Sequence, residues 1–227
     1  MDISLHYIKK GSGFPLLLLH GNGESGDYFV HQVDEFARYF TVYAVDTRGH
    51  GRSPRGTAPF TISQFADDLL EFMDEQEIGT AHILGFSDGG NTALTFALRR
   101  PERVGRLVLN GANLDPSGVK PSVQIPIVLG YRLASLFKAP KARANAELLG
   151  LMVNEPHIDP KKLAALAMPA LVIVGSRDMI QASHSRLIAD SLPKGRLTTI
   201  EGDHFIANKQ PAQFNRAVLE FLKEETP

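Results

Sequence analysis

The chain contains no cysteine among its 227 residues. This absence excludes disulfides, thiolate nucleophiles and metal sites built on cysteine. No apolar run approaches the roughly 18 to 20 residues that a membrane span needs. The N-terminal stretch MDISLHYIKKG also lacks the continuous apolar core of a signal peptide. Together these absences predict a cytoplasmic protein.

Net charge is almost absent as well. Lys and Arg number 24 against 25 Asp and Glu, which gives a formal net charge of −1, and no long basic run occurs. The chain therefore lacks the electrostatic footprint of a protein that binds nucleic acid or an anionic membrane surface. We expect a small-molecule substrate, no nucleic acid, no membrane and no cofactor or metal. The sequence leaves the oligomeric state open.

The pattern of apolar residues indicates an α/β protein. With 43% apolar and 22% charged residues, the chain can bury a large core. Short apolar runs alternate with stretches of helical period, and several runs are nearly continuous in Leu, Val and Ile, as in strands covered on both faces by helices. The runs are PLLLLHG (15–21), TVYAVD (41–46), AHILGFS (81–87), GRLVLNG (105–111), ALVIVGS (170–176) and GRLTTIEG (195–202). This order predicts a doubly wound, mostly parallel sheet in one domain, 1–227.

Helical spacing follows three of these runs. Thr61 and Gln64 form a T-x-x-Q capping box before an apolar stripe, and the pattern returns at 94–98 and 214–221. Segment 114–168 has no strand-like run; six prolines divide it, and 142–152 has helical character. We expect it to be an insertion in the domain. Its seven basic residues outnumber four acidic ones, which we interpret as a solvated surface, with a preference for anionic substrates as the alternative.

The motif Gly85-Phe86-Ser87-Asp88-Gly89 lies between an apolar run and a helical one. A G-x-S-x-G motif in this context predicts a sharp turn that lifts the serine hydroxyl above the sheet. Strand and helix then approach so closely that the residues two before and two after the serine must be nearly free of side chain. The alternative is that Ser87 only caps a helix.

A nucleophilic serine needs a histidine base oriented by a carboxylate. His204 and Asp178 each follow a predicted strand, at the edge where open α/β sheets place their sites. Asp203 is a rival for the acid, although neighbouring residues rarely orient well enough to share an imidazole. We interpret the remaining histidines as packing or surface groups, with His6, His82 and His157 in strand-like or insertion sequence and His31 and His184 in apparent helices.

These motifs together resemble the α/β-hydrolase family, in its serine-nucleophile branch. The resemblance rests on GFSDGG, on His20-Gly21 after PLLLL, on DTRGHGRS (46–53), on VGSRD and on EGDHF, and it covers nearly the whole chain except 114–168. It implies an α/β-hydrolase fold of about seven strands with a short helical lid over 114–168. The family usually has two strands before PLLLLHG, whereas this chain has room for one, around residues 3–8.

The resemblance also implies roles. Ser87 forms an acyl-enzyme, His204 is the general base and Asp178 its partner, while the backbone N–H groups of Asn22 and Asp88 form the oxyanion hole. His20 and residues 46–53 are expected to shape loops beneath the site. The reaction implied is hydrolysis of a small carboxylic ester, carboxylesterase-like. Thioester, lactone, C–C bond and perhydrolase chemistry remain open, as does a ligand-sensing module with slow turnover.

Asp88 has two interpretations. A carboxylate in the first turn of a helix interacts favourably with the helix dipole. Yet it stands where negative charge must develop during ester hydrolysis, which would suit a substrate ammonium. The elbow is similar to that of amino-acid-ester hydrolases of the valacyclovir-hydrolase type, which implies that Asp88 contacts the substrate's α-amino group.

Overall fold

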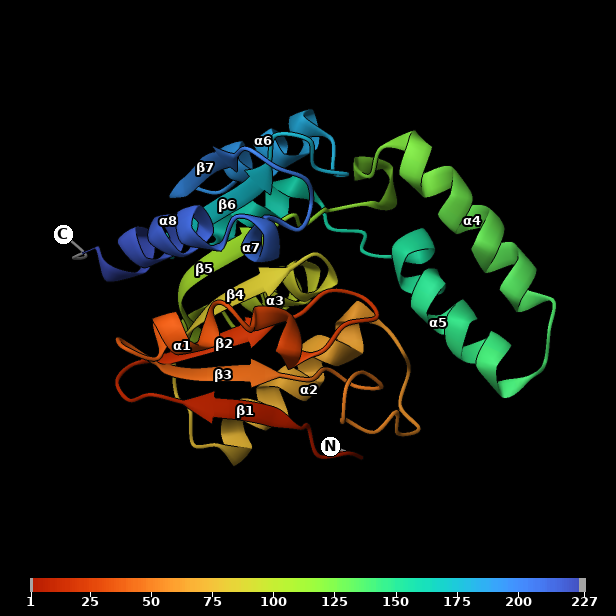
Figure 1. The fold of residues 1–227 in the computed structure, drawn as a ribbon, viewed down its shortest axis with the longest axis horizontal. Coiled ribbons are helices and arrows are strands. Elements are labelled where there is room, and N and C mark those ends of the chain that lie inside the picture. Colours follow the sequence, from red (N-terminus) through yellow and green to blue (C-terminus); the bar gives the residue numbers. More distant parts are fainter. Residues whose placement is uncertain (1, 225–227) are drawn as a thin grey trace.

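A single mixed sheet forms the centre of the molecule. The computed structural model describes residues 2–224. The strands occur in the order β1-β3-β2-β4-β5-β6-β7, and all neighbours are parallel except β1, which runs antiparallel to β3 (Figure 1). They are β1 (Tyr7–Lys10), β2 (Pro15–Leu19), β3 (Thr41–Val45), β4 (Ala81–Phe86), β5 (Val104–Asn110), β6 (Ala170–Gly175) and β7 (Gly195–Ile200). The predicted doubly wound, mostly parallel sheet of about seven strands is confirmed.

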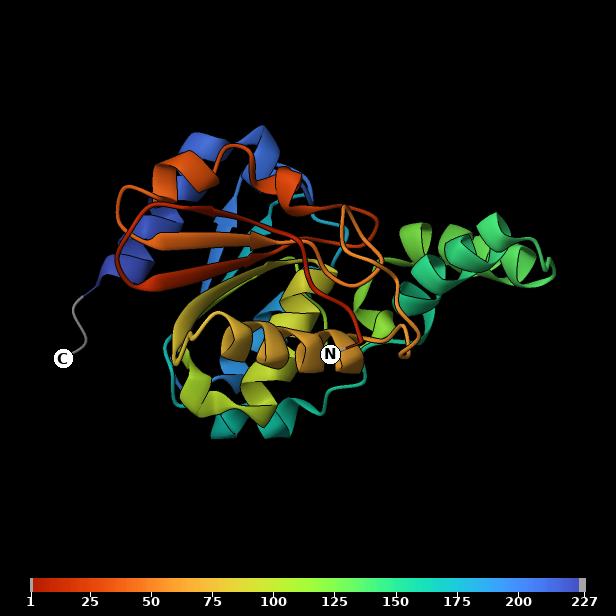
Figure 2. The ribbon, with the colours of Figure 1, turned by 90° about the horizontal axis from the view of Figure 1, so that it is seen from below.

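Helices cover both faces of the sheet (Figure 2). On one face, α2 (Ile62–Glu75), α3 (Asp88–Arg99) and α6 (Ala182–Ser191) enclose one apolar core; on the other, α1 (Val33–Phe36) and α8 (Pro211–Lys223) enclose a second, with α7 (Ile206–Lys209) beside α8. Because the central strands are buried on both faces, they read as continuous apolar runs. The remaining helical turns are 3₁₀: η1 (Gly26–Phe29), η2 (Pro101–Arg103), η3 (Pro116–Gly118) and η4 (Pro160–Ala165).

The sheet has a topological switch point between β2 and β4. The chain moves outward from β2 to β3, then returns through α2 to place β4 on the other side of β2. Loops that leave the carboxyl ends of two such strands diverge and open a crevice, where α/β proteins bind ligands. Here these loops begin at His20 and at Ser87.

Three local expectations need correction. The first strand begins at Tyr7 rather than near residue 3, because the His6 N–H donates to Ser53 Oγ and not to a neighbouring strand. His31 lies in a turn before α1, not in a helix. At the start of α2, Thr61 accepts from the Gln64 N–H at 3.1 Å, but the Gln64 side chain bonds Asp68, so the capping box is only half formed.

Between β5 and β6 the chain forms two long helices, α4 (Pro121–Ser135) and α5 (Pro140–Asn154), which pack on each other. The pair projects beyond the carboxyl edge of the sheet in both views (Figures 1 and 2). One tether to the body is a two-pronged ion pair, in which Arg55 donates to both carboxylate oxygens of Glu147. Within residues 2–224 no helix is long and apolar enough to span a bilayer.

Strand β4 and helix α3 meet with no room for a methyl group. A Cβ built on Gly85 would stand 2.2 Å from the carbonyl oxygen of Gly89, and one built on Gly89 would stand 2.1 Å from that of Leu19. Both obstacles are backbone atoms, which cannot rotate away. The two glycines of the G-x-S-x-G motif are therefore required by the crossing of β4, α3 and β2.

We therefore expect Gly85→Ala to lower the free energy of unfolding by about 1–3 kcal/mol or more, because overpacking of this kind displaces backbone. Gly79→Ala is the matched control, since a Cβ there meets nothing within 4 Å. Urea denaturation of both variants measures the difference. Equal stabilities of the two variants would show that β4 and α3 can accommodate a methyl group where they cross.

Candidate active site

Ser87 stands at the turn between β4 and α3. Its backbone has φ 53° and ψ −119°, a conformation that a side-chain-bearing residue adopts only under strain. The Ser87 N–H donates to the Asn110 carbonyl at 2.8 Å, and the Ser87 carbonyl accepts the first helical bond from Asn91. The side chain makes no capping bond to α3, so the hydroxyl is free for other chemistry and the helix-cap interpretation loses its basis.

His204 and Asp178 lie together in the loops after β7 and β6. The His204 Nδ1 is 2.7 Å from Asp178 Oδ1, and both side chains are about 95% or more buried. Because an ionised carboxylate only accepts, Nδ1 carries the proton and Nε2 presents its lone pair. Nε2 is buried and has no hydrogen-bond partner among residues 2–224. The His204 ring also lies 4.8 Å from that of Phe86, which precedes Ser87, so an imidazole with an unused nitrogen lies beside the elbow.

The pKa of Asp178 is held below its ordinary value. Burial alone would raise this pKa. Hydrogen bonds from His204 and from the N–H groups of Ile180 (2.9 Å) and Gly175 (3.3 Å) lower it by more than burial raises it. Asp178 therefore stays ionised and keeps the imidazole in one tautomer. Asp203 points elsewhere: its oxygens accept from the Phe205 N–H and from Lys209.

The turn after β2 brings backbone donors to the same place. Among residues 2–224, neither the Asn22 N–H nor the Asp88 N–H has a hydrogen-bond acceptor. His20 fixes this turn, because its Nδ1 bonds the Gly21 carbonyl at 2.7 Å and its Nε2 accepts from the Thr47 N–H at 3.0 Å. Burial lowers the pKa of His20 to about 4, so the ring is neutral. His20 therefore shapes a loop, as the sequence indicated.

Residues 46–53 also have a structural role. Asp46 accepts from the Gly26 N–H at 2.6 Å and from the Arg52 N–H at 2.8 Å, and Ser53 Oγ donates to the Asp46 carbonyl. Arg48 is fully buried and donates to both carboxylate oxygens of Asp68. These bonds tie the loop after β3 to its neighbours.

Asp88 is buried among groups of the site. Its Oδ1 accepts from Asn91 Nδ2 at 3.1 Å, whereas its Oδ2 is buried without a partner among residues 2–224. Burial raises the pKa of Asp88 to about 6, a shift that amide groups of Asn22 and Asn91 oppose and that Glu155 increases. Asp88 is therefore close enough to Asn22 and Glu155 for both to affect the pKa of its carboxyl.

Two further carboxyls stand nearby that the sequence did not indicate. Glu24 Oε2 accepts from the Gly21 N–H at 3.1 Å, and burial raises its pKa to about 7. Glu155 Oε2 accepts from the Ile62 N–H at 2.7 Å, and burial raises its pKa as well. Their positions depend on burial and on the fold of α5, which no local pattern reveals.

Neutral residues also support the site and escaped the sequence interpretation. Gly111 (φ 63°) makes room for the imidazole, since a Cβ there would stand 2.6 Å from a His204 ring carbon. Asn91 also donates to Asn113 Oδ1 at 3.0 Å and accepts from the Asn113 N–H at 2.9 Å. The sequence did contain a signal for Gly111, because this glycine directly follows the apolar run of β5. It contained no signal for the bonds between Asn91 and Asn113.

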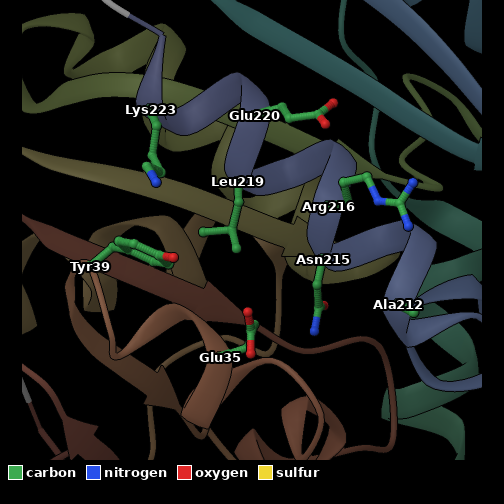
Figure 3. A pocket seen from close by; sticks show the side chains of 8 residues that line it. All are labelled: Glu35, Tyr39, Ala212, Asn215, Arg216, Leu219, Glu220 and Lys223. Atoms are coloured by element: carbon green, nitrogen blue, oxygen red, sulfur yellow. The ribbon is translucent and has the colours of Figure 1, made fainter.

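One surface hollow lies elsewhere, between α1 and α8 (Figure 3). Its lining runs along α8 from Ala212 to Lys223, with Glu35 and Tyr39 on the facing wall, so the hollow lies within the helix layer on one face of the sheet. Lys223 Nζ covers the Tyr39 ring at 3.9 Å. A hollow within a helix layer differs from the crevice at the carboxyl ends of the strands, where α/β sheets bind ligands. Among residues 2–224, no group of three or more His, Cys, Asp or Glu could hold a metal ion.

Comparison with known proteins agrees with the fold. Residues 15–146 match the model of the α/β hydrolase fold family. A protein from Caulobacter sp. (strain K31) that carries the name carbamate hydrolase RutD is 30% identical over 92% of this chain and 91% of its own. The crystal structure of a hydrolase from Pseudomonas aeruginosa PA01 is 29% identical, covers 98% of this chain and 95% of its own, and has a TM-score of 0.79.

An enol-lactonase from Burkholderia xenovorans LB400 has the same fold, with a TM-score of 0.83 and 24% identity over 98% of this chain and 97% of its own. The family model, the full-length relative and the seven-stranded sheet lead to one assignment. The chain belongs to the α/β hydrolase fold family of enzymes.

Proposed function

We propose that the protein is a serine hydrolase that cleaves a small carboxylic ester through an acyl-enzyme. The observation that carries this proposal is the free Nε2 of His204, whose Nδ1 is bonded to Asp178 at 2.7 Å, beside a serine on a strained turn. A histidine in this tautomer can take a proton from a serine hydroxyl. Ser87, His204 and Asp178 are thus the proposed catalytic residues.

In the proposed first step, Ser87 Oγ attacks the ester carbonyl carbon while its proton passes to His204 Nε2. The carbonyl oxygen becomes an oxyanion, which the N–H groups of Asn22 and Asp88 stabilise. His204 then gives the proton to the departing alkoxide oxygen, and the C–O bond breaks to leave an acyl-serine. Water, deprotonated by His204, attacks this acyl-serine; collapse releases the acid and returns the proton to Ser87.

We propose that segment 114–168 is a lid over this site within one domain. Asn22 Nδ2 donates to the Leu148 carbonyl of α5 at 2.7 Å, so the proposed oxyanion turn and the helix pair are in direct contact. Glu155, at the end of α5, influences the pKa of Asp88. Leu148 and Glu155, both away from the far end of the helix pair, therefore contribute a wall and a charge to the proposed pocket.

The acidic surroundings favour an ester that carries an amino group. Asp88 has one buried oxygen without a partner among residues 2–224, and the carboxyls of Glu24 and Glu155 are close enough to affect the charges of the site. A buried carboxylate without a cation is costly, and a substrate ammonium would supply one. We infer that Asp88 receives the α-amino group of an amino-acid ester.

The names of the similar proteins span several acyl bonds, including those of a carbamate and an enol-lactone. Ester, lactone and carbamate hydrolysis can all proceed through an acyl-enzyme. Assaying substrates of all three classes therefore identifies the preferred leaving group. A ligand-sensing module would show one burst of product and then stop, whereas an enzyme turns over repeatedly.

Ser87→Ala removes the proposed nucleophile. We expect the variant to lose hydrolysis of a short-chain p-nitrophenyl ester by more than about a thousandfold, and to lose labelling by a fluorophosphonate, because no other group can form the acyl bond. Circular dichroism checks that the variant is folded. A folded variant that keeps its activity would refute the proposal.

The two candidate acids can be compared directly. Asp178→Asn should reduce kcat by several orders of magnitude, because it allows the wrong imidazole tautomer. Asp203→Asn should have little effect, since that side chain bonds Lys209 and a backbone N–H instead of His204. Steady-state kinetics on the same ester measures both. The assignment of the acid is wrong if Asp203→Asn proves the more damaging.

Asp88→Asn tests the ammonium contact. A charge-assisted bond contributes about 1.5–3 kcal/mol, so kcat/KM for an aminoacyl ester should fall roughly 10- to 150-fold. The matching ester without an amino group should be almost unaffected, because the backbone N–H remains. Equal losses on both esters would mean that the substitution only disturbs the elbow.

The pH dependence follows from the pKa of Asp88, about 6. Only the carboxylate attracts an ammonium, so the preference for the aminoacyl ester over its neutral analogue should decline as pH falls through about 6. In Asp88→Asn this decline should disappear. A preference that is constant from pH 5 to 7 in the parent protein would contradict the contact.

The same shift affects stability. A folded-state pKa raised from 3.8 to about 6 means that the native state holds this proton more tightly, so stability falls as pH rises through that window. Asp88→Asn should therefore be more stable than the parent protein at pH 8, by up to about 3 kcal/mol, and should lose this advantage near pH 4. Thermal unfolding at the two pH values measures it.

A further inference from the structure

The far end of the α4–α5 pair concentrates exposed apolar side chains. We call residues 132–143, where α4 ends and α5 begins, the hairpin tip. Leu133, Leu136 and Phe137 are 60%, 76% and 56% exposed. Ile125 and Leu129, 59% and 60% exposed, continue the line along α4 at four-residue spacing. Apolar groups gathered on a projecting element mark an interaction surface more often than scattered ones do.

The charge of the same region has one sign. Residues 116–146 contain five basic side chains and no Asp or Glu, although the whole chain has a net charge of −1. Four of the basic residues belong to the hairpin tip and are exposed: Arg132, Lys138, Lys141 and Arg143. The rest of the chain is consequently net negative. The molecule thus has a positive, apolar end that net charge alone conceals.

We propose that the hairpin tip docks on an anionic phospholipid surface. Leu136 and Phe137 would enter the boundary between headgroups and acyl chains, while Lys138 and Lys141 would meet the lipid phosphates. Apolar side chains flanked by Lys and Arg bind such surfaces through buried area and charge together. This proposal departs from the expectation of no membrane partner, which was drawn from the net charge of the whole chain.

A second copy of the chain fits the hairpin tip less well. A twofold interface would set the same patch against itself. The four cations of one copy would then face those of the other, with no acidic residue between 116 and 146 to neutralise them. An anionic surface supplies the missing opposite charge.

Sedimentation with vesicles tests the proposal. The full chain should bind vesicles of phosphatidylglycerol in phosphatidylcholine but not vesicles of phosphatidylcholine alone, and added salt should weaken the binding by screening. The double variant K138Q/K141Q should partition about 30-fold more weakly, from roughly fivefold for each charge. L136S/F137S should also bind more weakly.

Matched control variants distinguish an effect of the hairpin tip on binding from a general effect of losing charged or apolar side chains. K161Q/K162Q removes two exposed charges outside the tip, and V30S/L187S removes two exposed apolar side chains elsewhere. Both should bind like the parent protein, and all four variants should keep hydrolysis of a water-soluble ester. Absent binding to anionic vesicles, equal binding to neutral ones, equal losses in the controls, or a dimer that L136S/F137S abolishes would each overturn the proposal.

Discussion

The site depends on one steric constraint, the crossing of β4 and α3 over the end of β2. Backbone atoms at Gly85, Gly89 and Leu19 meet without space for a Cβ. This contact holds Ser87 at φ 53° and starts α3 directly beneath it, so the first N–H groups of the helix have no partner within the helix. A looser crossing would allow the strain at Ser87 to relax and would displace the Asp88 N–H from the turn after β2.

Hydrogen bonding separates the carboxyls around this crossing into two kinds. Asp178 is buried, yet two N–H groups and His204 keep its pKa low. Asp88 is buried with one unpaired oxygen, and its pKa rises to about 6. Glu24, with one backbone donor, has a pKa of about 7. Burial acts to raise the pKa of all three, although Glu24 is only partly buried, so the hydrogen bonds that oppose it distinguish a fixed charge from a group that responds to pH or ligand.

Much of this arrangement was legible in the sequence, for physical reasons. Strands covered on both faces must be apolar throughout, which made 15–21, 81–87 and 170–176 conspicuous. Because parallel strands all end at one edge, residues that follow them converge, and the meeting of His204 with Asp178 could be anticipated. The crowded turn at Ser87 has a glycine signature for the same steric reason.

Other features had no sequence signal. Glu24 and Glu155 acquire their raised pKa values from burial that depends on how distant elements pack. The Asn91–Asn113 bonds join residues 22 positions apart whose amides could equally face water. The capping box at Thr61 is only half formed because the Gln64 side chain turns to Asp68, which Arg48 holds, and donates to it instead of accepting from the Thr61 N–H. Tertiary competition of this kind is invisible to local patterns.

The proposed oxyanion donors at Asn22 and Asp88 are main-chain groups, and every amino acid except proline supplies such a donor. Shape, rather than side-chain identity, therefore maintains this part of the chemistry. The side chains at the same two positions are free to serve another purpose: that of Asn22 bonds α5, and that of Asp88 bonds Asn91 beside the proposed nucleophile. Under the proposed function, exchanging these side chains would alter what is recognised and leave the bond-cleaving groups in place, so a few substitutions around a constant turn would give this scaffold a short route to new substrates.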